Sequence, residues 1–500
     1  MVKRSIRSFC AILAVICLLF SQPVFSENSA ATEDTSVSST QDDFINSVTT
    51  FVKEFYNGDV DDKTLIQGAL KGMFSTMDPY TTFFTPEEAD KFLGVLEDSF
   101  VGIGVTLEKK DNYIIITKAF PGSPAEKSGL CPGDRITSAN GKSLIGLMPE
   151  EAASYIKGEE GTKVKLGIIK AGDTSVTELV VDRQRVVMNP VTYDIRNGIG
   201  YIKLDSFSSN SAYSVSKALA VMDGKKITKI ILDLRNNGGG YVDQAVNIAN
   251  NFVPAGLVTK LDFKSPSMKD QTFYSYLLKQ KYKLAVLVNE NSASASEILS
   301  AAIQDTNAGT LVGTKTFGKA KVQNMIQVLT PEAYKKYEEE LGVKTINPNL
   351  LAAYDITPSK DEILGTIKIT TGMYTTPKGR MIDLKGLTPD IEVPDPKPVG
   401  GIDVNSIQKL RRVSKPDLGD SSPDVYNAEK ILKLLGYKVD TPDSRLNDTT
   451  FMAIKKLQAD NHLHSYGVLD YTTQNLLNNK LDQLFIKLDG QYAAAANVLK

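Results

Sequence analysis

Apolar residues near the N-terminus are spaced as on one face of an α-helix. The first group follows a stretch rich in Ser, Thr and Asp and comprises Phe44, Val48, Phe51, Val52 and Phe55. A second helical pattern covers residues 65–77. Thr85 and Pro86 begin a third, because threonine caps helix N-termini and proline suits the first turn. These patterns predict an N-terminal helical region.

Between residues 98 and 187 the pattern changes to short strand-like runs separated by glycines. The predicted strands are 104–107, 113–117, 135–138, 164–169 and 177–181, with one helix at 149–156. This order predicts a compact module that is rich in β-structure.

From Gly200 onward, strands alternate with helices. The predicted strands are 201–204, 230–234 and 284–288, and the predicted helices are 212–221, 242–250 and 294–305. This alternation indicates an α/β core. A strand-rich part at 365–393, a proline-rich linker and three short helices, at 423–435, 448–459 and 471–477, complete the pattern.

The predicted fold class is therefore α+β multidomain: N-terminal helices, a β-module, a mixed α/β core and a small C-terminal helical domain. The predicted boundaries are 1–26 for a leader, 27–97 for a linker and the helical region, 98–187 for the β-module, 188–397 for the α/β core, 398–420 for a linker and 421–484 for the helical domain.

The leader has the three parts of a secretory signal peptide. Basic residues come first, an apolar run spans 9–20, and a small residue, Ser26, precedes Glu27. The apolar run is short for a membrane span, which favours cleavage, although an uncleaved anchor stays open. We expect an extracytoplasmic protein. Cys131 is the only cysteine outside the leader, so no intrachain disulfide can form after cleavage.

Composition excludes several kinds of chemistry. The chain has two histidines, His462 and His464, both close to the C-terminus, so a Ser-His-Asp triad, a His-ligated zinc site or a Cys-His dyad is excluded from the core. A net charge of −2 without a basic tract makes nucleic acid a poor partner. The run from Gly313 to Lys319 is similar to a phosphate-binding loop, but Ala320 replaces the required Ser or Thr. We expect no cofactor and no metal.

Three segments of the core could carry chemistry. Ser294 lies where a predicted strand turns into a helix, beside unpaired helix N-terminal amides, an arrangement typical of acyl-transfer nucleophiles. The three glycines at 238–240 could turn backbone N–H groups toward an oxyanion. Lys319 could replace histidine as the base if burial lowers its pKa. Taken alone, each feature is more often a helix cap, a flexible turn or a solvated lysine.

Together these motifs resemble the carboxyl-terminal processing, or tail-specific, proteases. The resemblance rests on Ser-Ala-Ser294-Ala-Ser-Glu-Ile, Phe317-Gly-Lys319, Val322-Gln323, Asp-Leu-Arg-Asn-Asn-Gly-Gly-Gly240 and Asp78-Pro-Tyr80. It implies that Ser294 is the nucleophile, Lys319 the general base and Gln323 the residue that orients the lysine. The implied oxyanion donors are the N–H of Ala295 and that of a glycine, for which we take Gly239. Asp305 matches an acidic position that matters in some members.

Two further modules carry family resemblances. Residues 98–187 resemble a PDZ domain, and the resemblance implies a carboxylate-binding loop that includes Phe100, Gly102, Ile103 and Gly104. Residues 421–484 resemble a peptidoglycan-binding domain, although Leu446-Asn447-Asp448 departs from the usual pattern. These helices would bind peptidoglycan or, alternatively, form a homodimer. The insertion at 330–363 could be a lid or an interaction element, and the resemblance implies no role for it.

The function expected from the sequence is that of a secreted serine endopeptidase. A PDZ module would recognise protein or peptide substrates with free C-termini, and a Ser-Lys dyad would hydrolyse peptide bonds. The alternative is an inactive cell-wall scaffold that binds through the PDZ and C-terminal modules.

Overall fold

The computed structural model describes residues 36–343 and 348–500. The predicted leader, residues 1–26, and most of the following linker lie outside the described residues. The chain divides into two compact units, Met1–Ala69 and Leu70–Lys500. In the first unit, α2 (Ser36–Phe55) confirms the predicted amphipathic helix. The helix α3 (Asp62–Ser75) begins in this unit and confirms the second helical pattern.

The third predicted helix is α4 (Pro86–Leu96), in the second unit. Its N-cap is Thr85, whose hydroxyl accepts a hydrogen bond from the Glu88 N–H, while the Glu88 carboxylate accepts one from the Thr85 N–H at 2.8 Å. The short strand β1 (Thr82–Phe84) precedes it. At the two ends of the β-module, β2 (Ser99–Gly102) and β9 (Gln184–Val187) pair as antiparallel strands.

The β-module contains an antiparallel sheet with the strand order β3-β4-β5-β7-β8. Its strands are β3 (Val105–Lys110), β4 (Tyr113–Ala119), β5 (Arg135–Ala139), β6 (Lys142–Ser143), β7 (Lys163–Ile169) and β8 (Thr177–Asp182), and its helices are α5 (Pro124–Lys127) and α6 (Pro149–Ile156). Buried Ile114, Ile136, Leu166 and Ile156 belong to one separate core. The pattern-based prediction of this module is therefore confirmed.

A six-stranded sheet with the order β10-β11-β12-β15-β16-β19 forms the α/β core. Its strands are β10 (Val191–Arg196), β11 (Ile199–Leu204), β12 (Lys229–Asp233), β15 (Lys283–Val288), β16 (Thr310–Gly313) and β19 (Ile391–Glu392). All pairs are parallel except β10 with β11. Residues 230–233 and 284–288 are buried on both faces, as is typical of parallel strands covered on two sides.

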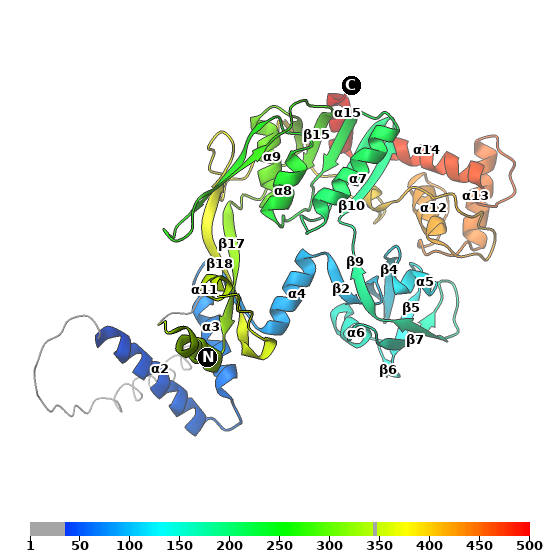
Figure 1. Ribbon diagram of the computed structural model, residues 1–500. Helices are drawn as coiled ribbons and strands as arrows, with labels where there is room; N and C mark the ends of the chain where they lie inside the picture. Colours follow the sequence, from blue (N-terminus) through cyan, green and yellow to red (C-terminus); the bar gives the residue numbers. More distant parts are fainter. Residues whose placement is uncertain (1–35, 344–347) are drawn as a thin grey trace, which may run out of the picture. The chain divides into compact units, whose positions relative to one another are not determined.

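Different parts of the chain cover the two faces of this sheet. The helices α7 (Ser211–Gly224), α8 (Val242–Ala249) and α9 (Ala295–Asp305) cover one face (Figure 1), where Leu232 and Val286 are buried. On the other face, Tyr201, Ile231 and Leu287 are buried in one cluster with residues of the C-terminal helices. The sheet is thus the middle layer of three.

The C-terminal helices are α12 (Pro423–Leu434), α13 (Asp448–Asp460), α14 (Tyr471–Leu488) and α15 (Gly490–Val498). The sequence pattern underestimated this part, because α14 continues beyond residue 477 and α15 was not predicted. Residues 398–420, expected as a linker, contribute Ile402, Val404, Ile407 and Leu410 to the same buried cluster. Among the described helices, none is long and apolar enough to cross a membrane.

A second sheet has the order β1-β18-β13-β14, and β17 also pairs with β18. Its further strands are β13 (Gly256–Phe263), β14 (Gln271–Ser275), β17 (Lys321–Leu329) and β18 (Ile363–Thr375). The insertion between β17 and β18 forms α10 (Pro331–Leu341) and α11 (Pro348–Ala353), with Ala333, Tyr337 and Leu351 in a small core. The insertion therefore extends a long antiparallel hairpin.

Candidate active site

Ser294 has a strained backbone at the N-terminus of α9. Its φ and ψ are 57° and −115°, a combination that non-glycine residues rarely adopt and that costs about 1–3 kcal/mol. The turn that holds it is bonded to residues 236–240, which we call the glycine loop. The Ala293 N–H donates to the Asn237 carbonyl at 3.1 Å, and the Ser296 hydroxyl donates to the same oxygen at 2.8 Å. The strained turn is therefore held by two hydrogen bonds to the buried residue Asn237.

Gly239 is the glycine that approaches the serine. A Cβ at this position would lie 2.8 Å from the Ser294 Cβ and 2.8 Å from the Ala293 carbonyl oxygen, and its φ is 102°. Only glycine fits this position without a shift of the backbone. The Gly239 N–H donates to Asn237 Oδ1 at 2.9 Å. By contrast, the Ala295 N–H donates to none of the described residues.

Lys319 lies in the loop before β17, with its side chain half-buried. Burial lowers the pKa of its amine, and the positive charge of Lys368 lowers it further, whereas Asp78 and Glu297 act in the opposite direction. Its Nζ lies 4.5 Å from the centroid of the Tyr80 ring. Among the described residues, no hydrogen bond joins this amine to the Ser294 hydroxyl. The amine thus faces an aromatic ring in this arrangement.

Glu297 joins the serine and lysine segments, although sequence reasoning gave it no role. Its carboxylate is fully buried and accepts hydrogen bonds from the N–H groups of Ser294 (3.0 Å), Gly318 (2.8 Å) and Lys319 (2.9 Å), and from the Thr316 hydroxyl (2.6 Å). One side chain thereby fixes the backbone at both residues of the expected dyad. The Ser-x-x-Glu spacing of a capping box was the signal that could have revealed it.

Tyr374 is a second link between these segments. Its side chain is buried in β18, and its hydroxyl lies 2.8 Å from the Lys319 carbonyl oxygen and 3.2 Å from that of Ser294. The separation of the two backbones is thus set from within the core. A buried tyrosine in a strand has no distinctive sequence signal, so it was not predicted.

Gln323 contacts a threonine and no atom of Lys319 among the described hydrogen bonds. Its Nε2 donates to the Thr370 hydroxyl at 3.2 Å, and that hydroxyl donates to Asp78 Oδ1 at 3.2 Å. Burial acts to raise the pKa of Asp78, but hydrogen bonds from the Tyr80 N–H and Thr370 hold it below its usual value. Thr370 on β18 therefore links Gln323 on β17 to Asp78 in the segment before β1.

Asp305 lies at the other end of α9 from Ser294. Its carboxylate accepts hydrogen bonds from the Thr376 hydroxyl at 2.6 Å and the Lys378 N–H at 2.9 Å, and it pairs with Arg380 at 2.6 Å. These contacts hold the turn after β18. Asp305 therefore stabilises this turn from the C-terminal end of α9.

In the β-module, Phe100 and Gly102 lie on β2, and Ile103 and Gly104 follow it. Ile103 is buried, and its carbonyl accepts from the Ala125 N–H at 2.8 Å. A Cβ at Gly104 would lie 2.3 Å from the Ser123 Cβ, so this position requires glycine. The loop is therefore fixed against the start of α5.

Two other kinds of chemistry would require a metal site or a reactive cysteine. Within the described residues, no group of three or more His, Cys, Asp or Glu side chains could hold a metal ion. Burial raises the pKa of the Cys131 thiol, which makes the thiolate less available.

Comparison with known proteins identifies three parts of the chain. Residues 198–393 match the model of peptidase family S41, residues 115–170 match a PDZ domain, and residues 421–477 match a putative peptidoglycan binding domain.

Relatives cover nearly the whole chain. The carboxy-terminal processing protease CtpA of Bacillus subtilis (strain 168) is 31% identical over 499 residues, which cover 98% of this chain and 96% of the relative. A probable CtpA-like serine protease of Staphylococcus aureus (strain bovine RF122 / ET3-1) is 30% identical over 450 residues, 89% of this chain and 82% of the relative. Among solved structures, the photosystem II D1 C-terminal processing protease is 23% identical, with a TM-score of 0.39, and the match covers 70% of this chain and 86% of that one.

The α/β core, the PDZ module and the C-terminal helices as far as the start of α14 contain the matched regions, and the predicted family and fold class are confirmed. The chain therefore belongs to the carboxy-terminal processing serine proteases of peptidase family S41 and carries a PDZ domain and a peptidoglycan-binding domain.

Proposed function

We propose that this protein is an extracytoplasmic endopeptidase in which Ser294 is the nucleophile and Lys319 the general base. The observation that carries this proposal is the Glu297 carboxylate, which binds the backbone N–H groups of both residues at 3.0 and 2.9 Å. A lowered lysine pKa supports the same assignment, because a base must be neutral to accept a proton.

The chemistry begins with rotation of the Lys319 amine from the Tyr80 ring toward the Ser294 hydroxyl. The neutral amine takes the hydroxyl proton, and the serine oxygen forms a bond to the substrate carbonyl carbon. The lysine ammonium then gives its proton to the leaving amine as the peptide bond breaks. Water attacks the ester, with Lys319 again as the base, and restores the serine.

The oxyanion would be bound by the free Ala295 N–H and by an N–H of the glycine loop. Gly239 lies against Ser294, but its N–H is bonded to Asn237 Oδ1. Its participation therefore requires that the substrate oxygen replace the Asn237 carboxamide. Gln323 would help to orient the Lys319 amine indirectly. It binds Thr370, and Thr370 in turn binds Asp78 near the amine.

The PDZ module would capture the C-terminal tail of a protein substrate. The residues that we assign to this task are Phe100, Gly102, Ile103 and Gly104, on and after β2. Consecutive N–H groups in such a loop bind a terminal carboxylate while the peptide adds a strand to the sheet. The predicted leader and the peptidoglycan-binding domain support a place at the cell envelope.

The test uses matched peptides with an apolar C-terminal residue, either as the free acid or as the amide. We expect faster cleavage of the free acid, and loss of about 10³-fold or more in kcat/KM for Ser294→Ala and Lys319→Ala, without an effect of a metal chelator. Full activity of either variant would refute the dyad. Binding of the peptides without hydrolysis by the wild-type protein would favour the scaffold alternative.

A further inference from the structure

A buried arginine lies directly before the glycine loop. Arg235 separates the end of β12 from Asn236 and Asn237, and its side chain is only 6% exposed. A guanidinium is stable in such a place only where acceptors and opposite charges surround it. The groups that surround Arg235 therefore show what fixes this part of the loop.

The first of these groups is Asp233, the last residue of β12. Arg235 Nε donates to its two carboxylate oxygens at 2.9 and 3.1 Å, and Nη2 donates at 2.6 Å. The Tyr201 hydroxyl donates to the same carboxylate at 2.5 Å. These contacts are local to the sheet.

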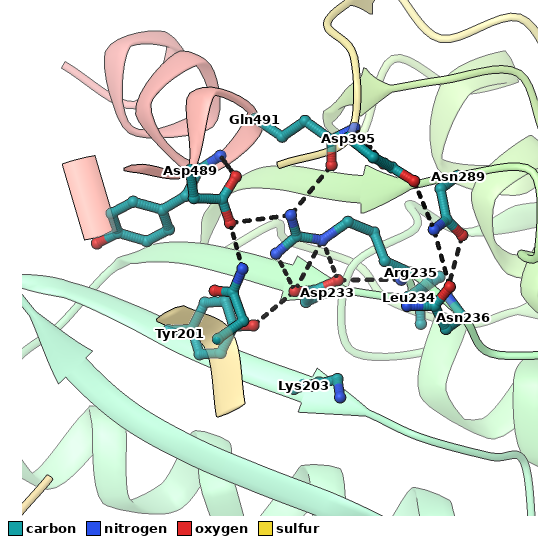
Figure 2. A network of polar contacts seen from close by, with 12 residues as sticks. Tyr201, Lys203, Asp233, Leu234, Arg235, Asn236, Asn289, Asp395, Asp489 and Gln491 are labelled. Atoms are coloured by element: carbon teal, nitrogen blue, oxygen red, sulfur yellow. Dashed lines mark hydrogen bonds and ion pairs between the residues drawn. The ribbon is translucent and has the colours of Figure 1, made fainter. Parts of the chain in front are cut away.

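The second set of groups comes from the end of the chain. Arg235 Nη1 donates to Asp489 Oδ2 at 2.9 Å and to Gln491 Oε1 at 3.0 Å (Figure 2), and both side chains are fully buried. Asp489 is also the N-cap of α15, since its Oδ1 accepts from the Tyr492 N–H at 2.9 Å. Its carboxylate is thus held by a helix N-terminus as well as by the arginine.

The same network reaches the serine turn. Gln491 Nε2 donates to Asp395 Oδ1 at 2.6 Å, and Asn289 Nδ2 donates to Asp395 Oδ2 at 3.0 Å (Figure 2). Asn289 exchanges two hydrogen bonds with Asn236, of 2.9 and 3.0 Å. Asn236 begins the glycine loop and Asn289 begins the turn that leads to Ser294, so the end of the chain is connected to both.

We propose that Asp489 and Gln491 are positioning residues of the active site, which act through Arg235 to fix the backbone of residues 236–239. This inference rests on the proposed function, because it takes the glycine loop as part of the oxyanion site. The peptidoglycan-binding-like helices are then joined to the glycine loop through α15, the last helix of the chain.

The effect belongs to the chemical step, because an oxyanion donor contributes only when its N–H points at the developing charge. Asp489→Asn keeps the size and N-cap capacity of the side chain but removes one of the two negative charges that oppose Arg235, while Asp233 keeps the other. Gln491→Leu removes one acceptor and leaves both carboxylates in place. Each change weakens what holds Nη1 of the guanidinium, although Asp233 still binds Nε and Nη2, and residues 236–239 are held less firmly as a result.

The experiment compares full-length Asp489→Asn with the matched variant Asp482→Asn. Asp482 lies on α14 and pairs with Lys409 at 2.9 Å, so it helps to hold the same helices against the sheet, but its partners among the described residues lie outside the loop. The measurements are kcat and KM for a peptide with a free apolar C-terminus, the rate of Ser294 labelling by a fluorophosphonate, and the folded fraction by circular dichroism.

For Asp489→Asn we expect kcat to fall about tenfold to a hundredfold with KM within about threefold, and labelling to slow in parallel. Asp482→Asn is expected to keep wild-type kcat per folded molecule. Equal kcat losses in both variants, or losses that only follow the folded fraction, would overturn the inference.

Gln491→Leu decides the matter if Asp489→Asn does not fold, and we expect the same pattern with a smaller loss of kcat. Wild-type kcat in Gln491→Leu would then count against the inference. A wild-type protein without Ser294-dependent hydrolysis would instead remove the proposed function itself, so the two failures are distinguishable.

Discussion

At the scale of the residue, the environment of Lys319 determines whether it can act as a base. Burial and Lys368 lower the pKa of the amine, whereas Asp78 and Glu297 oppose the shift. Lys368 is itself half-buried, with its Nζ 4.7 Å from the centroid of the Phe92 ring, so its charge is held near the site. The two lysines are therefore coupled through charge repulsion.

This coupling predicts the effect of Lys368→Met on the pH profile. The neutral form of Lys319 is the active base, so kcat/KM rises as pH increases through its pKa, and the lowered pKa moves this rise below that of an ordinary lysine. Removal of the Lys368 charge raises the Lys319 pKa. The rising limb of log kcat/KM against pH should therefore move to higher pH, with lower activity at neutral pH.

Lys281→Met is the control for this measurement, because Lys281 pairs with Asp223 and is not among the groups that act on Lys319. We expect its profile to match that of the wild type. An unchanged limb in Lys368→Met would mean that another group titrates in the profile.

At the scale of the element, the sequence predicted the strands and helices that carry the site but not how they are held together. The buried run at 284–288 and the Ser-Ala repeat before α9 have local signals, and both elements occur where expected. Glu297 and Tyr374, whose side chains join the Ser294 turn to the Lys319 loop, act between segments that are distant in sequence. Hydrophobic periodicity reports burial and carries no information about such a partner.

The glycine loop gives the prediction for this scale, because two adjacent glycines differ in their surroundings. A Cβ at Gly239 would meet Ser294 and Ala293 at 2.8 Å, whereas a Cβ at Gly238 would meet no atom within 4 Å. Gly239→Ala must therefore separate the loop from the nucleophile. We expect kcat to fall about a hundredfold or more, the size of effect seen when an oxyanion donor is lost.

Gly238→Ala is the matched control, since it adds the same methyl group one residue away. We expect its kcat and melting temperature to stay close to those of the wild type. Gly239→Ala is strained at a φ of 102° and should also melt at a lower temperature, so kcat is compared per folded molecule. Equal kcat values in the two variants would contradict the assigned contact between Gly239 and Ser294.

At the scale of the whole molecule, one sheet is shared between the peptidase core and the C-terminal helices. The face with Tyr201, Ile231 and Leu287 belongs to one buried cluster with residues of α12–α15, and α15 packs directly on β15 and β16. Sequence patterns separated these parts, because the linker is rich in proline and α15 has apolar residues without the alternation of an amphipathic helix. A helix that is apolar on most sides is typical of a buried position, which only the tertiary structure reveals.

A shared core predicts that damage to the last helix reaches the peptidase. Ala495 is fully buried in this cluster, whereas Asn497, two residues later on α15, is exposed. Ala495→Asp places an unpaired charge against the sheet and should reduce the free energy of unfolding by more than about 4 kcal/mol, whereas Asn497→Asp should change it by less than about 0.5 kcal/mol. Thermal unfolding and peptidase activity, followed on the same samples, test this. In Ala495→Asp the folded structure and the peptidase activity should be lost together, in one transition at a lowered temperature. An independent C-terminal domain would instead unfold separately and leave an active peptidase, and a second, unshifted transition with full activity would show that the sheet does not need its third layer.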